Sequence, residues 1–222
     1  MMIPRVKICC ISSLEEARLA VRYGASALGL VGKMPSGPGV IEDSLIKTIA
    51  DHIPPAVASF LLTSEVRAES ILEHHYLTHT NTLQLVDYLN VETYEQLHGE
   101  LPWIKLVQVI HVIDEEDIRR AKMVEPYVDA LLLDSGNPNL KVKVLGGTGN
   151  IHNWTISRKI RDEVNIPVFL AGGLHAGNVR EAIETVEPYG LDLCSGVRTN
   201  GKLDEEKLEA FFSAVYGVFF DK

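Results

Sequence analysis

Two residues suited to proton transfer stand at the ends of short aliphatic runs. Cys9 and Cys10 end the run that begins at Arg5, and Asp134 follows Ala130–Leu133. A thiol near a cation or a helix N-terminus can lose its proton at neutral pH, and a carboxyl shielded from water can keep one. The sequence therefore predicts Cys9 as general base and Asp134 as general acid at a sugar carbon. The alternative for Cys9 is a small buried apolar side chain.

Alternation along a strand bears on the two adjacent cysteines. Successive side chains of a strand point to opposite faces. We therefore expect only one of Cys9 and Cys10 to reach the mouth of the site.

Glycine-bearing turns follow the last two aliphatic runs. They contain Gly172 and Gly173 in one turn and Ser195 and Gly196 in the other. Glycine lets backbone N–H groups approach an anion closely, and the recurrent phosphate site of a barrel enzyme is built from its last two loops. These four residues predict a phosphorylated ligand; ordinary turns are the alternative.

The longest connection spans residues 135–153 and contains Gly146, Gly147, Thr148 and Gly149. Loops longer than about 12 residues in a compact domain are usually lids or binding loops. We interpret this one as a lid over the substrate; an insertion without a function is the alternative. A nucleotide-binding P-loop is excluded because no Lys-Ser/Thr pair follows the glycines.

Four further polar residues near predicted strand ends are candidate substrate contacts: Lys33, Gln84, His111 and Arg198. The histidines His74, His75 and His79 lack the companion ligands of a metal site, so a solvated helix end is the favoured interpretation. We expect neither a metal nor a cofactor.

Strands and helices alternate along the whole chain, and they must position these residues. Eight strands are predicted, each followed by a stretch with helical spacing. The strands are Arg5–Cys10, Ala27–Leu30, Ala56–Leu62, Thr82–Leu85, Lys105–Ile110, Ala130–Leu133, Val168–Ala171 and Leu191–Cys194. Ser13 is the expected N-cap of the first helix and Gly24 its end.

Eight such units in 222 residues leave about 28 residues each, which favours a single-domain (β/α)8 TIM barrel over residues 1–222. An open, doubly wound sheet is the alternative. It would usually carry phosphate-binding glycines after its first strand, but residues 9–13 contain none.

Composition excludes several classes of protein. A net charge of −9 without a basic patch argues against nucleic acid as a partner. The longest apolar runs are far shorter than the roughly 20 residues of a membrane span, and residues 1–7 do not resemble a secretion signal. Three cysteines form no disulfide framework, so a reducing cytoplasm is expected.

Strings in the same order along nearly the whole chain resemble the phosphoribosylanthranilate isomerase family. They are Lys7-Ile8-Cys9, Ala25-Ser26-Ala27-Leu28-Gly29-Leu30, Leu132-Leu133-Asp134, Gly146-Gly147-Thr148-Gly149 with Trp154, Leu170-Ala171-Gly172-Gly173-Leu174 with Asn178-Val179, and Ser195-Gly196-Val197. Each string is weak alone, but the ordered set is specific.

The resemblance implies a cofactor-independent Amadori rearrangement in tryptophan biosynthesis. The residue matching Asp134 protonates the ribose ring oxygen and opens the sugar to a Schiff base. The residue matching Cys9 then removes the proton from C2, and the enolamine becomes a ketone. The loops of Gly172 and Ser195 hold the phosphate. The sequence leaves a monomer and a homodimer open.

Departures from the family pattern concern the group attached to the sugar. Pro38 stands where the family has a carboxylate-binding arginine, and Val86 where it has a histidine. Asn153 replaces an aspartate, Arg198 a glutamate and Cys10 a glycine. The acid, the base and the phosphate loops are kept, whereas a charge-assisted hydrogen bond worth roughly 1.5–3 kcal/mol is lost. Lys33 or Arg198 is the candidate replacement cation.

These departures keep other functions open. One is a paralogue that isomerises a different amino-sugar phosphate, and another is a sugar-phosphate-binding barrel without catalysis. A Schiff-base aldolase or lyase is disfavoured, because Lys7 lies inside its strand and Lys105 begins its strand, so neither stands at a strand end.

Overall fold

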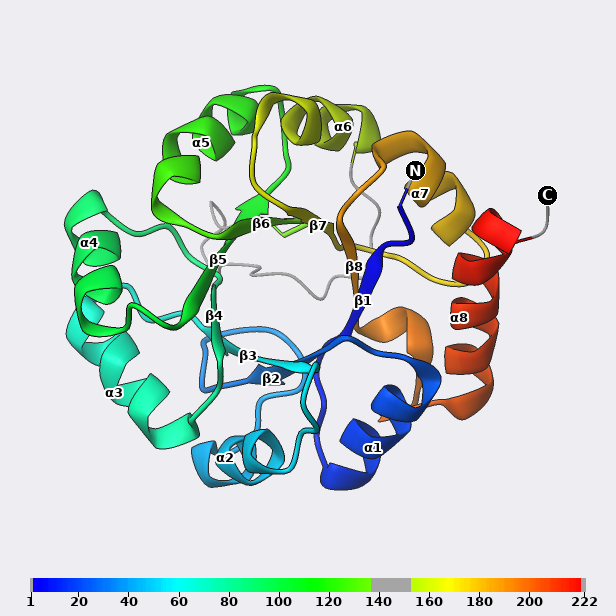
Figure 1. Ribbon diagram of the computed structural model, residues 1–222, viewed down its shortest axis with the longest axis horizontal. Coiled ribbons are helices and arrows are strands. Elements are labelled where there is room, and N and C mark those ends of the chain that lie inside the picture. The colour runs from blue at the N-terminus through cyan, green and yellow to red at the C-terminus, as the bar shows by residue number, and fades with distance from the viewer. Residues whose placement is uncertain (1, 137–152, 221–222) are drawn as a thin grey trace.

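The computed structural model describes residues 2–136 and 153–220. Eight parallel strands pair in chain order and close into one barrel, with β1 hydrogen-bonded to β8 (Figure 1). The strands are β1 (Arg5–Ile8), β2 (Ala27–Val31), β3 (Ala58–Thr63), β4 (Thr82–Leu85), β5 (Lys105–His111), β6 (Ala130–Asp134), β7 (Val168–Leu170) and β8 (Gly190–Leu193). The predicted barrel is confirmed, and the open sheet is excluded.

A ring of helices surrounds the strands (Figure 1). They are α1 (Leu14–Tyr23), α2 (Asp43–Asp51), α3 (Ala68–Thr78), α4 (Val91–Glu100), α5 (Glu116–Val124), α6 (Trp154–Glu163), α7 (Val179–Val186) and α8 (Glu205–Phe220). The 3-10 turns η1 (Glu125–Tyr127) and η2 (Ser195–Val197) and the hairpin of β9 (Arg198–Thr199) and β10 (Lys202–Leu203) complete the described elements. Both predicted ends of α1 are confirmed. The Ser13 hydroxyl caps its N-terminus by accepting a hydrogen bond from the Glu16 N–H, and Gly24 ends the helix with a φ of 108°.

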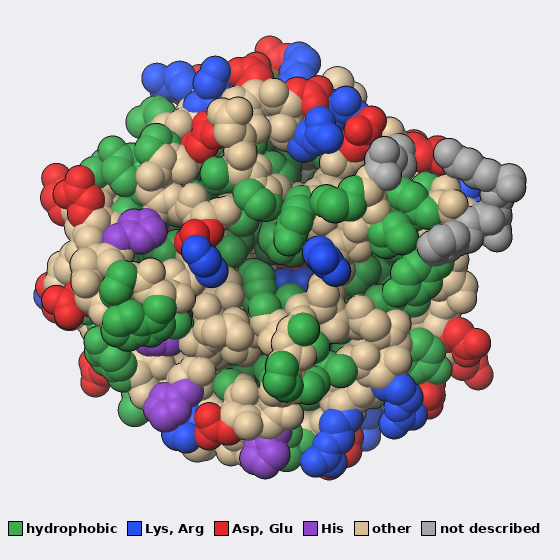
Figure 2. Space-filling model, viewed as in Figure 1, with side chains coloured by type: hydrophobic (Ala, Val, Ile, Leu, Met, Phe, Trp, Pro, Cys, Tyr) green, Lys and Arg blue, Asp and Glu red, His purple; other side chains and the backbone are tan. Residues whose placement is uncertain are grey.

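Alternation divides the strand side chains between two cores. One face packs against the helices, as Ile8, Leu30 and Leu133 do. The other fills the barrel with smaller and aromatic side chains, including Phe60 and Phe169, whose rings meet edge to face. On the face shown in Figure 2, acidic and basic side chains intermix around the rim. No helix in the described ranges is long and apolar enough to cross a membrane.

The histidines of α3 correct one expectation. His74 and His75 are buried, so the expected solvated helix end holds only for His79, which is exposed at the end of α3. The His74 ring lies between the Thr63 hydroxyl (Nδ1–Oγ1 3.2 Å) and the Asp43 carboxylate (Nε2–Oδ1 3.0 Å). Helix α3 packs on α2 and β3, and this places the ring between two polar partners. Within residues 2–136 and 153–220, no group of three His, Cys, Asp or Glu side chains is placed to hold a metal.

Candidate active site

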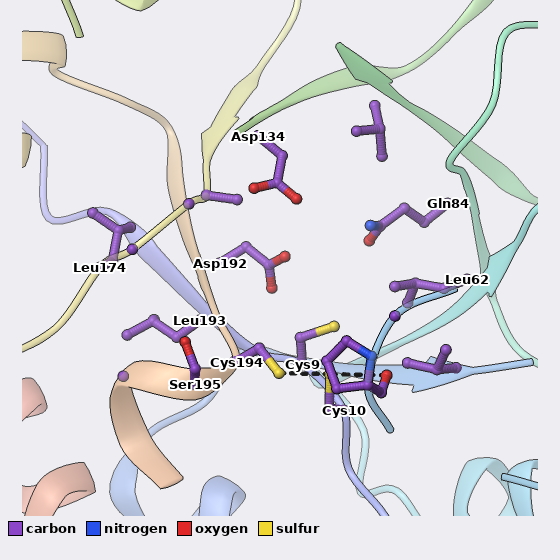
Figure 3. Close-up of a pocket in the computed structure, with 18 of the residues that line it drawn as sticks. Cys9, Cys10, Leu62, Gln84, Asp134, Leu174, Asp192, Leu193, Cys194 and Ser195 are labelled. Carbon is purple, nitrogen blue, oxygen red and sulfur yellow. Dashed lines mark hydrogen bonds between the residues drawn. The ribbon is translucent and has the colours of Figure 1, made fainter. Parts of the chain in front are cut away.

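A pocket opens at the carboxyl ends of the strands, where loops from both halves of the barrel converge. Cys9, Gln84 and Asp134 project into it from β1, β4 and β6 (Figure 3). The described residues that line it are Cys9, Cys10, Val31, Met34, Gly37, Pro38, Leu62, Gln84, Val109, Asp134, Ala171, Gly172, Gly173, Leu174, Asp192, Leu193, Cys194, Ser195 and Gly196. Both predicted proton-transfer residues and all four predicted phosphate-loop residues are therefore brought together.

Cys9 directly follows β1 and faces the barrel interior. Its N–H donates to the Leu193 carbonyl (2.7 Å), which continues the pairing with β8. Gly29 on the neighbouring strand leaves the space for its sulfur, because a Cβ there would lie 2.7 Å from Cys9 Sγ and 2.9 Å from Lys7 Nζ. The thiol therefore sits in a space shaped by a glycine.

Asp134 ends β6 and is 8% exposed. Burial raises the pKa of its carboxyl, and the nearby Asp192 carboxylate raises it further. The Ser135 N–H, which donates to Oδ1 at 2.7 Å, opposes this shift without reversing it. A carboxyl that keeps its proton to higher pH is suited to act as an acid.

A buried ion pair under the pocket was missed at the sequence level. Lys7 is fully buried, and its Nζ lies 2.8 Å from Asp192 Oδ1. Burial alone lowers the pKa of Lys7, but the Asp192 carboxylate and the Cys9 thiol outweigh it and raise the pKa, so the ammonium stays charged. Lys7 stands two residues before Cys9, a spacing that could have indicated the same face of the strand.

The two predicted phosphate loops pack directly against one another. Gly172 and Gly173 adopt positive φ angles of 83° and 65°. A Cβ on Gly196 would lie 1.9 Å from the Leu174 carbonyl oxygen, so only glycine permits this approach. Ser195 begins the turn η2 beside them. The predicted lid residues Gly146, Gly147, Thr148 and Gly149 lie outside the described residues.

Of the four candidate contacts, only Gln84 lines the pocket, where its buried Oε1 has no hydrogen-bond partner in the described part of the chain. His111 is buried with Nε2 3.0 Å from the Val86 carbonyl oxygen, and it does not line the pocket. Lys33 is exposed beyond β2, and Arg198 turns toward α1. Neither cation is among the described lining residues.

Cys10 contradicts the expectation that only one cysteine reaches the site. Strand β1 ends at Ile8, and Cys10 adopts a φ of 60°, so strand alternation no longer applies to it. Its Sγ lies 2.7 Å from that of Cys194, and both residues line the pocket (Figure 3). Both cysteines are free, and the hydrogen bond between their thiol groups raises the pKa of Cys10 and lowers the pKa of Cys194.

Comparisons with known proteins agree with this geometry. Residues 6–214 match the family model of N-(5'-phosphoribosyl)anthranilate (PRA) isomerase. N-(5'-phosphoribosyl)anthranilate isomerase 2 of Methanosarcina mazei is 38% identical over 218 residues, which cover 97% of this chain and 96% of that protein. The crystal structure of the Thermotoga maritima isomerase aligns with a TM-score of 0.82 and 30% identity, over 96% of this chain and 99% of that one.

A further isomerase structure, solved with reduced 1-(o-carboxyphenylamino)-1-deoxyribulose 5-phosphate, aligns with a TM-score of 0.80 and 28% identity over 96% of this chain and 99% of that one. The resemblance noted in the sequence is thus confirmed. The chain belongs to the N-(5'-phosphoribosyl)anthranilate isomerase family and is an isomerase.

Proposed function

We propose that this chain converts N-(5'-phosphoribosyl)anthranilate to 1-(2-carboxyphenylamino)-1-deoxyribulose 5-phosphate in tryptophan biosynthesis, without a cofactor. The observation that carries the proposal is the shared pocket: Cys9 and Asp134 face it together with the paired loops of Gly172 and Ser195. A proton donor, a proton acceptor and an anion site are the three parts that this reaction needs.

Asp134 acts first, as the general acid. Its carboxyl donates a proton to the ribose ring oxygen, the C1–O bond breaks, and the nitrogen lone pair forms the protonated Schiff base at C1. Burial and the Asp192 charge support this role, because both keep the proton on the carboxyl. The resulting Asp134 carboxylate is stabilised by the Ser135 N–H.

Cys9 acts second, as the general base. The iminium at C1 acidifies the C2 proton, so a moderate base such as a thiolate is sufficient. The electrons of the C2–H bond form the enolamine, which tautomerises to the ketone. The buried ammonium of Lys7 lies on the same side of the barrel interior and interacts electrostatically with Cys9. General acid–base groups of this kind contribute about 10²- to 10⁴-fold each.

The backbone N–H groups of Gly172, Gly173, Ser195 and Gly196 hold the phosphate in this proposal.

The other wall of the pocket favours a second candidate substrate. Val31, Met34 and Leu62 line it, and the described lining residues include no Lys or Arg that could pair with a carboxylate. A different amino-sugar phosphate, with an uncharged group on nitrogen, is therefore the alternative.

We propose that the enzyme works in the cytoplasm. We propose further that it is a monomer or a homodimer.

The test is an assay with N-(5'-phosphoribosyl)anthranilate generated enzymatically in the cuvette. We expect the wild type to consume it, and Cys9→Ala and Asp134→Asn each to lose at least about a hundredfold in kcat. Full turnover by either variant would remove the role of that residue. A wild type that converts only analogues without the carboxylate would favour the alternative substrate.

A further inference from the structure

The charge of Arg198 suggests a contact with an anionic substrate, but the side chain lies outside the pocket. Its side chain is 8% exposed and points at α1 rather than into the pocket. Nη1 and Nη2 lie 2.9 Å and 3.0 Å from the two carboxylate oxygens of Glu16. This two-point pairing matches the planar fork of a guanidinium to a carboxylate.

The same guanidinium also holds the turn that carries Cys9. Nη2 donates to the carbonyl oxygens of Cys9 (3.3 Å) and Cys10 (2.5 Å), two successive peptide groups. The Cys9 N–H still bonds to β8, but the carbonyls of Cys9 and Cys10 lie beyond the paired residues of β1 and need other partners to stay in one place. Arg198 supplies them on the side of the turn away from the pocket.

Glu16 joins three elements at this point. Its carboxylate accepts from the N–H of Ser12 and from that of Leu203, each at 2.9 Å, besides the two bonds from Arg198. The β1–α1 turn, helix α1 and the β9–β10 hairpin therefore meet at one ion pair. Removing one partner would leave the other as a poorly compensated buried charge.

We propose that Arg198 and Glu16 form a positioning pair that sets the place of the Cys9 sulfur relative to C2 of the substrate. The pair touches no reacting atom; it acts through the carbonyls of Cys9 and Cys10. A displacement of about 1 Å at a catalytic group can cost about a hundredfold in rate. The inference rests on the proposed function of Cys9.

The experiment compares Arg198→Met, Arg198→Lys and Glu16→Gln with the wild type. We expect kcat to fall about a hundredfold in Arg198→Met and about tenfold in Arg198→Lys, because an ammonium cannot reproduce the fork. KM should stay within about threefold. Glu16→Gln keeps the shape of the side chain and should lose about tenfold in kcat while remaining folded.

A second readout does not depend on turnover. In a Cys10→Ala, Cys194→Ala background Cys9 is the sole cysteine. We expect Arg198→Met to change the pH profile of its alkylation by iodoacetamide. If the wild type fails to convert the substrate but this profile still shifts, the proposed function fails and the positioning role stands.

Arg158→Met is the matched control. It removes an arginine that pairs with Asp162 of α6 and with Glu187 at the end of α7, away from the pocket. We expect its kcat and alkylation profile to equal the wild type. Arg198→Met with a lowered Tm but unchanged kcat and alkylation profile would overturn the proposal. So would a large rise in KM alone, which would make Arg198 a direct substrate contact.

A separate observation concerns Cys10 and Cys194, which the proposed mechanism does not use. Their sulfurs lie 2.7 Å apart, and a disulfide joins sulfurs at about 2.05 Å. We propose that the two residues are a modification site that forms an intrachain disulfide with hydrogen peroxide. The Cys194 thiol loses its proton, its thiolate attacks one peroxide oxygen to give a sulfenic acid, and the released hydroxide takes up that proton as water; the Cys10 sulfur then displaces the sulfenic hydroxyl, which leaves with the Cys10 proton as a second water. Two thiols and one peroxide thus give one disulfide and two waters.

Mass spectrometry of the peroxide-treated full chain tests this second proposal. We expect the intact mass to fall by two hydrogen atoms and the peptide map to link Cys10 with Cys194, reversibly on addition of dithiothreitol. Cys9→Ser should keep the link, and Cys194→Ser should abolish it. Stepwise oxygen addition without a link, or a link through Cys9, would overturn it.

Discussion

The two sides of the barrel mouth differ in what they offer a substrate. The side built by β6, β7 and β8 presents a carboxyl with a raised pKa and two interlocked glycine loops. The opposite side, built by β2 and β3 and the loop through Pro38, presents mainly apolar side chains. In the proposed reaction, proton donation and phosphate binding thus use one side of the mouth and recognition of the group on nitrogen uses the other, so we expect mutations to separate them.

The largest expected effect separates the two adjacent thiols that follow β1, between these two sides. We expect Cys9→Ala to lose about 10²- to 10⁴-fold in kcat, since it removes the proposed general base. Cys10→Ala is the comparison and should lose far less, because its thiol is held by Cys194, the Pro38 carbonyl and Cys9 and has no part in the proposed proton transfer. Steady-state kinetics of both variants measure this. Equal losses would show that the two thiols are not distinguished by their positions.

A second expected effect breaks the contact between the phosphate loops. Gly196→Val places a side chain against the Leu174 carbonyl, so one loop must move. We expect KM for the phosphorylated substrate to rise by at least about tenfold. Gly99→Ala is the control, because nothing lies within 4 Å of its added Cβ, and it should leave KM unchanged. An unchanged KM in Gly196→Val would contradict a phosphate site in these loops.

A third prediction tests the apolar side. Pro38→Arg adds a cation to a wall that lacks one among the described lining residues. If the substrate carries a carboxylate there, KM should fall about tenfold, as one charge-assisted hydrogen bond implies. Pro38→Met adds similar length without charge and should give no such gain. Equal KM values for the two variants would indicate that no carboxylate is bound on this side.

The smallest expected effect is on stability. Burial raises the pKa of Asp134 in the folded chain, so the neutral carboxyl favours folding at low pH, and this contribution is lost as the pH rises through the folded pKa. Asp134→Asn stays neutral throughout. Its Tm relative to the wild type should therefore increase as the pH is raised from about 4, near the pKa of an unfolded aspartate, through the raised folded pKa. A difference that is independent of pH would show that the carboxyl has no raised pKa.

The fold and the convergence of the site could be predicted because both follow from chain order. Parallel strands in sequence bring all their carboxyl ends to one face, so Cys9, Asp134 and the two glycine loops had to lie there. Strand identities and the cap of α1 follow from residue patterns within single elements.

Features that depend on two distant segments could not be predicted. The ion pairs of Lys7 with Asp192 and of Arg198 with Glu16 join opposite ends of the chain, and each charged residue alone suggests exposure. The alternation of side chains along a strand does not apply to Cys10, because β1 ends two residues before it. The burial of His74 and His75 likewise depends on where α3 packs.

The most direct test of the central claim is a crystal structure of this chain with reduced 1-(o-carboxyphenylamino)-1-deoxyribulose 5-phosphate. The account predicts the Cys9 sulfur beside C2, the Asp134 carboxyl within hydrogen-bonding distance of the hydroxyl derived from the ring oxygen, and the phosphate on the backbone of Gly172 and Ser195. A sulfur directed away from the sugar, or a phosphate bound at another rim of the barrel, would contradict it.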